Sequence, residues 1–193
     1  MHLSVDELRD KVEEFRSSGL NTQQIADELS LSQTTVQWLS ASDFEVDDKP
    51  VDVKVGWRSI AVKGERIEAI SYVFCDIIEE MVGEEIDTIV GVSINGIAFA
   101  QSVSSILDLE LAVVRSINED VAGHLSQVYA GVEGKRVVII DDVYSSGKTM
   151  SKIAEDLTNA GADVKLCMVL VNKSWDDDVG GFPLRALVRA ATV

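Results

Sequence analysis

Between residues 63 and 171 the sequence alternates apolar, strand-like runs with amphipathic, helix-like segments. The runs cover residues 87–93, 109–115, 135–143 and 164–171, and the helical segments cover 63–83, 97–108 and 149–161. Short apolar strands alternating with helices are typical of a parallel sheet that is covered by helices on both faces. Ligands of such sheets bind beyond the carboxyl ends of the strands. We therefore expect an α/β fold with its functional residues at those ends.

The most specific motif in this region is VVIIDDVYSSGKTM at residues 137–150. A buried strand delivers two carboxylates, and a turn of serine and glycine leads into a helix. The amides at a helix N-terminus can hold a phosphate. The acids can accept hydrogen bonds from ribose hydroxyls or approach the Mg²⁺ that accompanies a pyrophosphate. The motif predicts a sugar-phosphate site at Asp141, Asp142, Ser145, Ser146, Gly147, Lys148 and Thr149.

The segment Gly147-Lys148-Thr149 imitates the end of a nucleotide P-loop, but a P-loop requires glycine where this chain has Asp142. The motif instead resembles the phosphoribosyl-diphosphate motif of type I phosphoribosyltransferases. These proteins keep a pyrophosphate-binding loop between an earlier strand and helix, and the corresponding residues here are Ser93, Ile94, Asn95 and Gly96. The resemblance covers residues 63–171 and implies the type I phosphoribosyltransferase fold, a parallel sheet flanked by helices.

The resemblance does not extend to the catalytic loop. Phosphoribosyl transfer builds negative charge on the leaving pyrophosphate, and cations must stabilise it. The orotate branch of the family, which this chain most resembles, supplies a mobile loop of the form Arg-Lys, then Lys, then His-Gly. Arg115 and His124 are kept here, but Ser116 and Glu119 stand at the lysine positions. We therefore assign no catalytic residue and expect no efficient transfer; such a loop suits a sensor that closes on a ligand.

The residues after the last expected strand have two interpretations. In purine-type relatives a lysine and an aromatic residue at this place hold the base, which would give such roles to Lys173, Trp175 and Phe182. Alternatively, the two aromatic residues cover the sheet edge while Asp176 to Asp178 form a solvated turn. We favour the second interpretation.

The first 45 residues are expected to form a helical unit. Ser4 begins a capping box, and Thr22 and Ser32 are expected to cap two further helices. The last two helices resemble a helix-turn-helix DNA-binding unit, in which Ser30 stands where glycine often supplies a positive φ. Glutamine can pair with adenine in the major groove. The base-reading residues on the outward face of the last helix are expected to be Gln33, Thr34, Thr35 and Gln37.

A polar segment containing Pro50 follows and loses helical periodicity. We place the domain boundary near residue 45. The expected domains are a helix-turn-helix DNA-binding domain at 1–45 and a phosphoribosyltransferase-like, ligand-sensing domain at 46–193.

The charge of the chain argues against a protein that coats nucleic acid. Acidic residues outnumber basic ones 33 to 17, which gives a net charge of −16. Either the charge is an adaptation to a salty cytoplasm, or DNA is contacted through a small surface whose local field differs from the global one. The alternative to DNA binding is a helical module that serves dimerisation or docks a protein partner.

Two further features limit the class of protein. Cys75 and Cys167 lie in apolar segments and are expected to be buried thiols, with no Cys or His at metal-ligand spacing. We therefore expect no metal site built by the protein alone. No stretch approaches the ~20 apolar residues of a membrane span, and the first residues lack a signal-peptide pattern. A cytoplasmic protein without a membrane partner is expected.

The order of the two units, with the altered loop, resembles the archaeal orotate-phosphoribosyltransferase-like regulators of glucose and fructose catabolism. The resemblance spans almost the whole chain. It implies promoter DNA as a partner, control of sugar catabolism, and phosphoribosyl diphosphate or a nucleotide as effector. No cofactor is required, although Mg²⁺ would accompany a phosphoribosyl diphosphate ligand, and a homodimer is expected. The rival function is an active phosphoribosyltransferase of nucleotide salvage or synthesis with an appended helical module.

Overall fold

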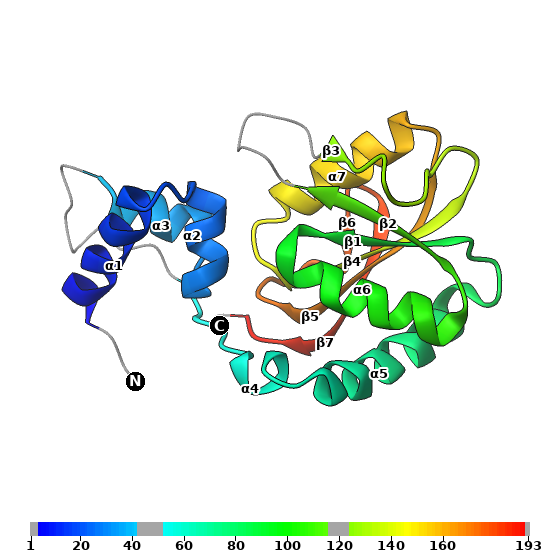
Figure 1. Ribbon diagram of the computed structural model, residues 1–193, viewed down its shortest axis with the longest axis horizontal. Coiled ribbons are helices and arrows are strands. Elements are labelled where there is room, and N and C mark those ends of the chain that lie inside the picture. The colour runs from blue at the N-terminus through cyan, green and yellow to red at the C-terminus, as the bar shows by residue number, and fades with distance from the viewer. Residues whose placement is uncertain (1–3, 42–51, 116–123, 192–193) are drawn as a thin grey trace. The chain divides into compact units, whose positions relative to one another are not determined.

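The computed structural model describes residues 4–41, 52–115 and 124–191. The chain forms two compact units, residues 1–56 and 57–191, which Figure 1 shows as a small helical unit and a larger α/β unit. The boundary that the sequence predicts near residue 45 lies outside the described residues. Within the described ranges, no helix is both long enough and apolar enough to cross a membrane.

The helical unit consists of α1 (Val5–Ser17), α2 (Thr22–Leu29) and α3 (Gln33–Leu39). The predicted capping box at Ser4 is confirmed, and Ser32 caps α3 as predicted. The predicted cap of α2 was wrong by one residue. The Asn21 side chain accepts a hydrogen bond from the Gln24 backbone, and the Gln24 side chain accepts one from the Asn21 backbone. Because this reciprocal pair makes Asn21 the cap, Thr22 is the first residue of the helix and not its cap.

Apolar residues at helical spacing on the three helices meet in one core. Its buried members are Val12, Ile25, Ala26, Leu29, Val36 and Leu39. The turn between α2 and α3 places Ser30 in the left-handed conformation, with φ 54°. Serine therefore adopts here the conformation for which such turns often carry glycine. Leu31 follows, and its side chain packs against the core.

The α/β unit contains α4 (Arg58–Ala61), α5 (Gly64–Val82), β1 (Thr88–Val92), α6 (Ser93–Leu107), β2 (Glu110–Arg115), β3 (His124–Leu125), β4 (Arg136–Tyr144), α7 (Lys148–Asn159), β5 (Asp163–Asn172), β6 (Asp178–Val179) and β7 (Phe182–Arg189). The strand order is β3-β2-β1-β4-β5-β7-β6, with parallel pairing from β2 to β7 and antiparallel pairing of β3 and β6 at the two edges. The α/β fold class that the sequence predicts is confirmed.

Helices cover both faces of this sheet. The helices α5 and α6 lie on one face and α7 lies on the other (Figure 1). The central strand β1 is buried along its whole length, as expected for a strand with helices on both sides. Cys75 and Cys167 are buried and form no disulfide, which confirms the prediction for both. Burial raises the pKa of the Cys75 thiol to about 11 and that of Cys167 to about 12.

Strand β7 is absent from the sequence-based prediction. It pairs parallel with β5, with Cys167 beside Leu184 and Asn172 beside Arg189. Its sequence FPLRALVR contains a proline and two arginines, and only Leu184 is buried. The strand therefore lacks the continuous apolar run that marks the central strands, and its position is set by pairing with β5.

Candidate functional site

The expected site residues gather where the sheet reverses its winding. Strand β1 has β2 on one side and β4 on the other, so the connections after β1 and β4 leave the sheet in opposite directions. Such a switch point is where open α/β sheets bind ligands, beyond the strand carboxyl ends. Asp141 and Asp142 follow the continuously buried run Val137–Ile140 of β4, and α6 begins directly after β1. The two motifs that the sequence singles out are thus brought together.

Residues Ser93 to Gly96 form the first turn of α6 rather than the loop that the sequence predicts. The reason is a close approach between the helix and the sheet. A Cβ on Gly96 would lie 2.5 Å from the carbonyl oxygen of Ile140 and 2.8 Å from the Cα of Asp141. Because neither atom can move far, only glycine allows α6 to begin this close to β4. This packing places Asn95 beside the acid pair.

Asp142 is a buried polar group of the site, with 8% of its surface exposed. Its Oδ2 atom accepts a hydrogen bond from Asn95 Nδ2 at 3.0 Å and another from Trp57 Nε1 at 2.8 Å. Its backbone N–H donates to Asp141 Oδ1 at 2.9 Å. Burial raises the pKa of the Asp142 carboxyl, and the hydrogen bonds from Trp57 and its other donors oppose that rise. Asp141 is only partly buried.

Trp57 is a site residue that sequence reasoning missed. Its indole packs against Phe99 of α6, with ring centroids 5.3 Å apart, and Phe99 in turn meets Phe74 edge-on at 5.5 Å. Trp57 and Asp142 are 85 positions apart in the chain. No local pattern links a tryptophan near the start of a domain to an acid at the end of its fourth strand. Only the fold brings them together.

The expected phosphate-binding turn leads from β4 into α7. Gly147 caps the helix with φ 73°, and a Cβ there would lie 2.8 Å from Cζ of the Tyr144 ring. Within the described residues, no side chain caps this helix. Its first N–H groups therefore face the turn formed by Ser145 and Ser146, in the arrangement that binds anions at helix N-termini. Lys148 is exposed in the first turn, and Thr149 is partly buried there.

Tyr144 connects this turn to the segment that follows β5. Its hydroxyl donates to Asp176 Oδ2 at 3.1 Å. Burial and the nearby Asp176 carboxylate raise the pKa of Tyr144 to about 12. The Tyr144 ring therefore packs against the expected phosphate-binding turn at Gly147, and its raised pKa keeps the phenol neutral.

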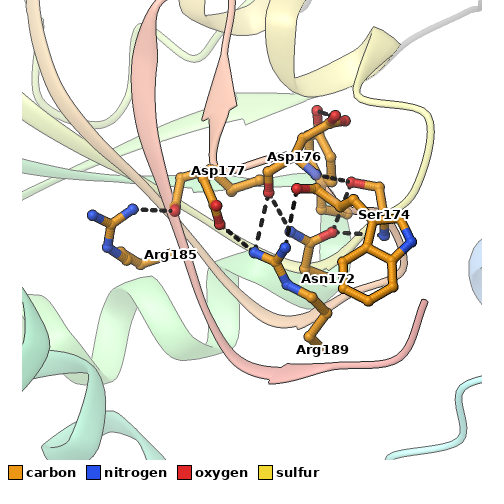
Figure 2. Close-up of polar contacts among 9 residues, drawn as sticks. Asn172, Ser174, Asp176, Asp177, Arg185 and Arg189 are labelled. Atoms are coloured by element: carbon orange, nitrogen blue, oxygen red, sulfur yellow. Dashed lines mark hydrogen bonds and ion pairs between the residues drawn. The ribbon is translucent and has the colours of Figure 1, made fainter.

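The segment after β5 is ordered by hydrogen bonds (Figure 2). The buried Asn172 donates to the carbonyl of Asp176 at 2.8 Å and accepts from the backbone N–H and the hydroxyl of Ser174. Arg189 of β7 donates to the same carbonyl and pairs with Asp177. Asp176 to Asp178 are exposed, as the favoured interpretation predicts, but the Asp176 carbonyl and the Asp177 carboxylate also bind Asn172 or Arg189.

The two aromatic residues of this segment differ. Phe182 packs against the core, as the favoured interpretation predicts. Trp175 does not cover the sheet edge: it is 65% exposed, and the Arg189 guanidinium lies 6.0 Å from its ring centroid. The prediction for Trp175 was therefore wrong, because its ring is exposed to solvent beside Arg189.

The two ends of the expected mobile loop meet at the edge of the sheet. Arg115 ends β2 and His124 begins β3, and the two are paired directly in the antiparallel register. The Arg115 side chain is exposed. The residues between them, 116–123, lie outside the described residues, so the altered lysine positions at Ser116 and Glu119 are known from the sequence alone.

The expected base-reading residues of α3 divide into two groups. Thr34 and Gln37 are exposed, and Gln33 is partly exposed with its amide donating to Gln23. Thr35 does not lie on the outward face, which corrects the prediction. It is 5% exposed, and its hydroxyl donates to Asp52 Oδ2 at 2.7 Å. Its hydroxyl also lies 2.9 Å from the Ser32 hydroxyl, so the side chain takes part in the N-terminal cap of α3.

The chain resembles known proteins both in its α/β unit and over its full length. Residues 57–180 match the phosphoribosyl transferase domain family. The transcriptional regulator GfcR of Thermoplasma acidophilum is 41% identical over 98% of this chain and 98% of its own length.

Solved structures share the fold at lower identity. An adenine phosphoribosyltransferase from Thermoanaerobacter pseudethanolicus superposes with a TM-score of 0.60, at 19% identity over 73% of this chain and 90% of its own. An orotate phosphoribosyltransferase from Aeropyrum pernix gives a TM-score of 0.57, at 18% identity over 87% of this chain and 92% of its own. The chain therefore has the type I phosphoribosyltransferase fold and belongs to the GfcR family of archaeal transcriptional regulators.

Proposed function

We propose that this protein is a DNA-binding regulator of central sugar catabolism whose α/β unit binds phosphoribosyl diphosphate or a nucleotide as its effector. The observation that carries the effector site is the convergence of the Asp141 and Asp142 carboxylates with the N-termini of α6 and α7 at one switch point. Carboxylates suit ribose hydroxyls, and helix N-termini suit phosphates.

The ligand would lie between the two motifs. Its 5-phosphate would meet the amides and hydroxyls of Ser145, Ser146, Gly147, Lys148 and Thr149. Its pyrophosphate would face the first turn of α6, at Ser93 to Gly96, with Mg²⁺ bound to the ligand's own oxygens. Arg115 and His124, at the edge of the sheet, would also bind the ligand. The exposed Lys148 adds a positive charge near the phosphates.

Binding of DNA is proposed for the exposed face of α3. Thr34, Gln37 and Gln33 are accessible side chains with hydrogen-bonding groups, on the second helix of a helix-turn-helix. A homodimer would present two such helices to two half-sites, and the effector would change their spacing. A ligand can shift this equilibrium only if it binds one arrangement more tightly than the other. Such a regulator would act in the cytoplasm.

The DNA half of the proposal is tested by crosslinking the protein to genomic DNA and sequencing what it holds. Promoter enrichment is expected for the natural protein and should disappear when Gln33 and Gln37 are changed to alanine. Gln101→Ala, an exposed glutamine on α6, is the matched control and should leave enrichment unchanged. If neither the natural protein nor the control enriches promoters, the helical unit docks a protein partner instead.

The effector half is tested by calorimetry with phosphoribosyl diphosphate and Mg²⁺. Changing Asp141 and Asp142 to asparagine should abolish binding, because an amide offers one acceptor oxygen in place of two. The exposed pair Asp76→Asn and Glu80→Gln removes the same charge from the outside of α5 and should leave binding intact. Pyrophosphate release on adding a nucleobase would support the rival function, an active transferase.

A further inference from the structure

One carboxylate oxygen of the proposed effector site is already occupied by the protein. Asp142 Oδ2 accepts from Trp57 Nε1 and from Asn95 Nδ2 at the same time. A carboxylate oxygen offers about two lone-pair sites. A ribose hydroxyl that donates to this atom must therefore displace one of the two protein donors.

The two donors differ in how easily they can leave. Asn95 lies in the first turn of α6, which is pressed against β4 at Gly96, so its backbone stays in place and only its short side chain can turn away. Trp57 is only partly buried and precedes α4, a four-residue helix with no buried residue and, within the described residues, no side-chain cap. Segments with so few buried contacts open most readily. Although its ring packs against Phe99, Trp57 is therefore the donor that we expect to leave more readily.

The chain that leads away from Trp57 runs directly to the proposed DNA-reading helix. Asp52, five positions earlier, accepts from the Ser32 backbone N–H at 2.8 Å and from the Thr35 hydroxyl at 2.7 Å. Asp52 thereby joins the N-terminal cap of α3. Five peptide units span at most about 18 Å, so these two anchors are joined by a short connector.

We propose that Trp57 is the positioning residue through which effector occupancy reaches the helical unit. In the ligand-free protein its indole N–H holds Asp142 and fixes one end of the connector, residues 53–56. A ribose hydroxyl that donates to Asp142 replaces this N–H, and the released connector lets α3 respond through Asp52. The inference rests on the proposed function for both its ligand and its DNA.

The first test follows Trp57 itself. The chain has three tryptophans, Trp38, Trp57 and Trp175. Changing Trp38 and Trp175 to phenylalanine leaves Trp57 as the only indole. Its fluorescence should change on adding phosphoribosyl diphosphate with Mg²⁺, with the same saturation curve that calorimetry gives. An emission spectrum that stays constant while calorimetry records binding would overturn the proposal.

The second test removes the hydrogen-bond donor of Trp57 while it keeps an aromatic ring at this position. Trp57→Phe keeps an aromatic ring against Phe99 but has no N–H, and Trp175→Phe is the matched control. The natural protein and the control should change their affinity for the recovered promoter fragments by roughly tenfold when phosphoribosyl diphosphate is added, a usual size for coupling between sites. Trp57→Phe should bind the ligand at least as tightly, because a competing donor is gone, but lose this change.

The outcomes distinguish the inference from the function beneath it. A full ligand response in Trp57→Phe overturns the role of Trp57 and leaves the proposed function standing. A natural protein that binds neither phosphoribosyl diphosphate nor promoter DNA overturns the proposed function, and the inference with it. The fluorescence test uses the native Trp57, so it decides the ligand-dependent step even if Trp57→Phe folds poorly.

Discussion

Gly96 on α6 and Ile140 on β4 approach so closely that a Cβ on Gly96 would lie 2.5 Å from the Ile140 carbonyl oxygen. We expect Gly96→Ala to destabilise the fold by about 1–3 kcal/mol, the usual cost of overpacking. It should also weaken binding of phosphoribosyl diphosphate, because Asn95 moves with the displaced turn. Denaturant unfolding and calorimetry measure the two effects.

Gly64, at the start of α5, is the matched control for this substitution. A Cβ there meets nothing within 4 Å. Alanine is favoured over glycine in a helix by roughly 0.5–1 kcal/mol, so Gly64→Ala should be as stable as the natural protein or more so. Equal stability and ligand affinity in both alanine variants would show that α6 is not held by the contact at Gly96.

Thr35 and Thr34 are neighbours on α3, but we expect their substitution to affect stability to different extents. The Thr35 hydroxyl donates to Asp52 inside the unit, whereas Thr34 is exposed. Thr35→Val keeps the shape and removes the hydroxyl, so it should lower the stability of the helical unit by about 1–2 kcal/mol. Thr34→Val should change stability by no more than about 0.5 kcal/mol. Circular dichroism during thermal unfolding measures both, and a fully stable Thr35→Val would contradict the inward role.

The ion pair of Asp87 and Arg136 should make the protein sensitive to acid. Arg136 donates through Nε at 3.0 Å, Nη2 at 3.0 Å and its backbone N–H at 2.8 Å. The Arg136 side-chain and backbone hydrogen bonds hold the pKa of the Asp87 carboxyl far below its ordinary value of 3.8. A carboxyl with a lowered folded pKa stabilises the fold fully above the unfolded pKa. That contribution is lost as the pH falls from about 4 downwards.

Melting temperatures measured across this acid range test the prediction. Asp87→Asn should melt lower than the natural protein near neutral pH, and the difference should shrink as the pH falls below about 4. Glu85→Gln is the control, because Glu85 also faces Arg136, at 3.5 Å, but its side chain is 80% exposed. It should keep the acid dependence of the natural protein. A pH-independent difference for Asp87→Asn would refute the role of ionisation.

Tyr144 should produce the opposite dependence at alkaline pH. Burial, with the nearby Asp176 carboxylate, raises the pKa of its phenol to about 12. A raised folded pKa stabilises the fold fully below the unfolded value near 10, and the contribution is lost as the pH rises from about 10 to about 12. Tyr144→Phe should reduce this alkaline loss of stability, and the half-exposed Tyr129→Phe should not. Tyrosinate absorbance checks the titration directly; ionisation of Tyr144 near pH 10 would contradict it.

The features predicted correctly from sequence are those with a local cause. The capping box at Ser4 and the cap at Ser32 each need only neighbouring residues. The central strands could be recognised because burial on both faces demands continuous apolar runs. The acids and the Ser145 to Thr149 turn could be placed together because one strand, one turn and one helix carry them. The turn at Ser30 could also be located locally, although serine adopts the positive φ there for which such turns often carry glycine.

The features that the sequence could not supply depend on long-range contacts. Gly96 starts α6 without a loop because its missing Cβ fits against β4, a strand 44 positions later, as the contact with Ile140 shows. Strand β7 exists because β5 offers it hydrogen-bond partners, although its own residues are half exposed.

By itself, the sequence determined the helix periods, the caps at Ser4 and Ser32, and the acid pair with the turn that follows it, because each follows from residues close together in the chain. Tertiary structure alone decided that Thr35 faces inward toward Asp52 and that Trp57 donates to Asp142 across 85 positions. The physical reason is that a buried polar group must find a partner wherever the fold supplies one. The residues near the polar group in the sequence do not identify that partner.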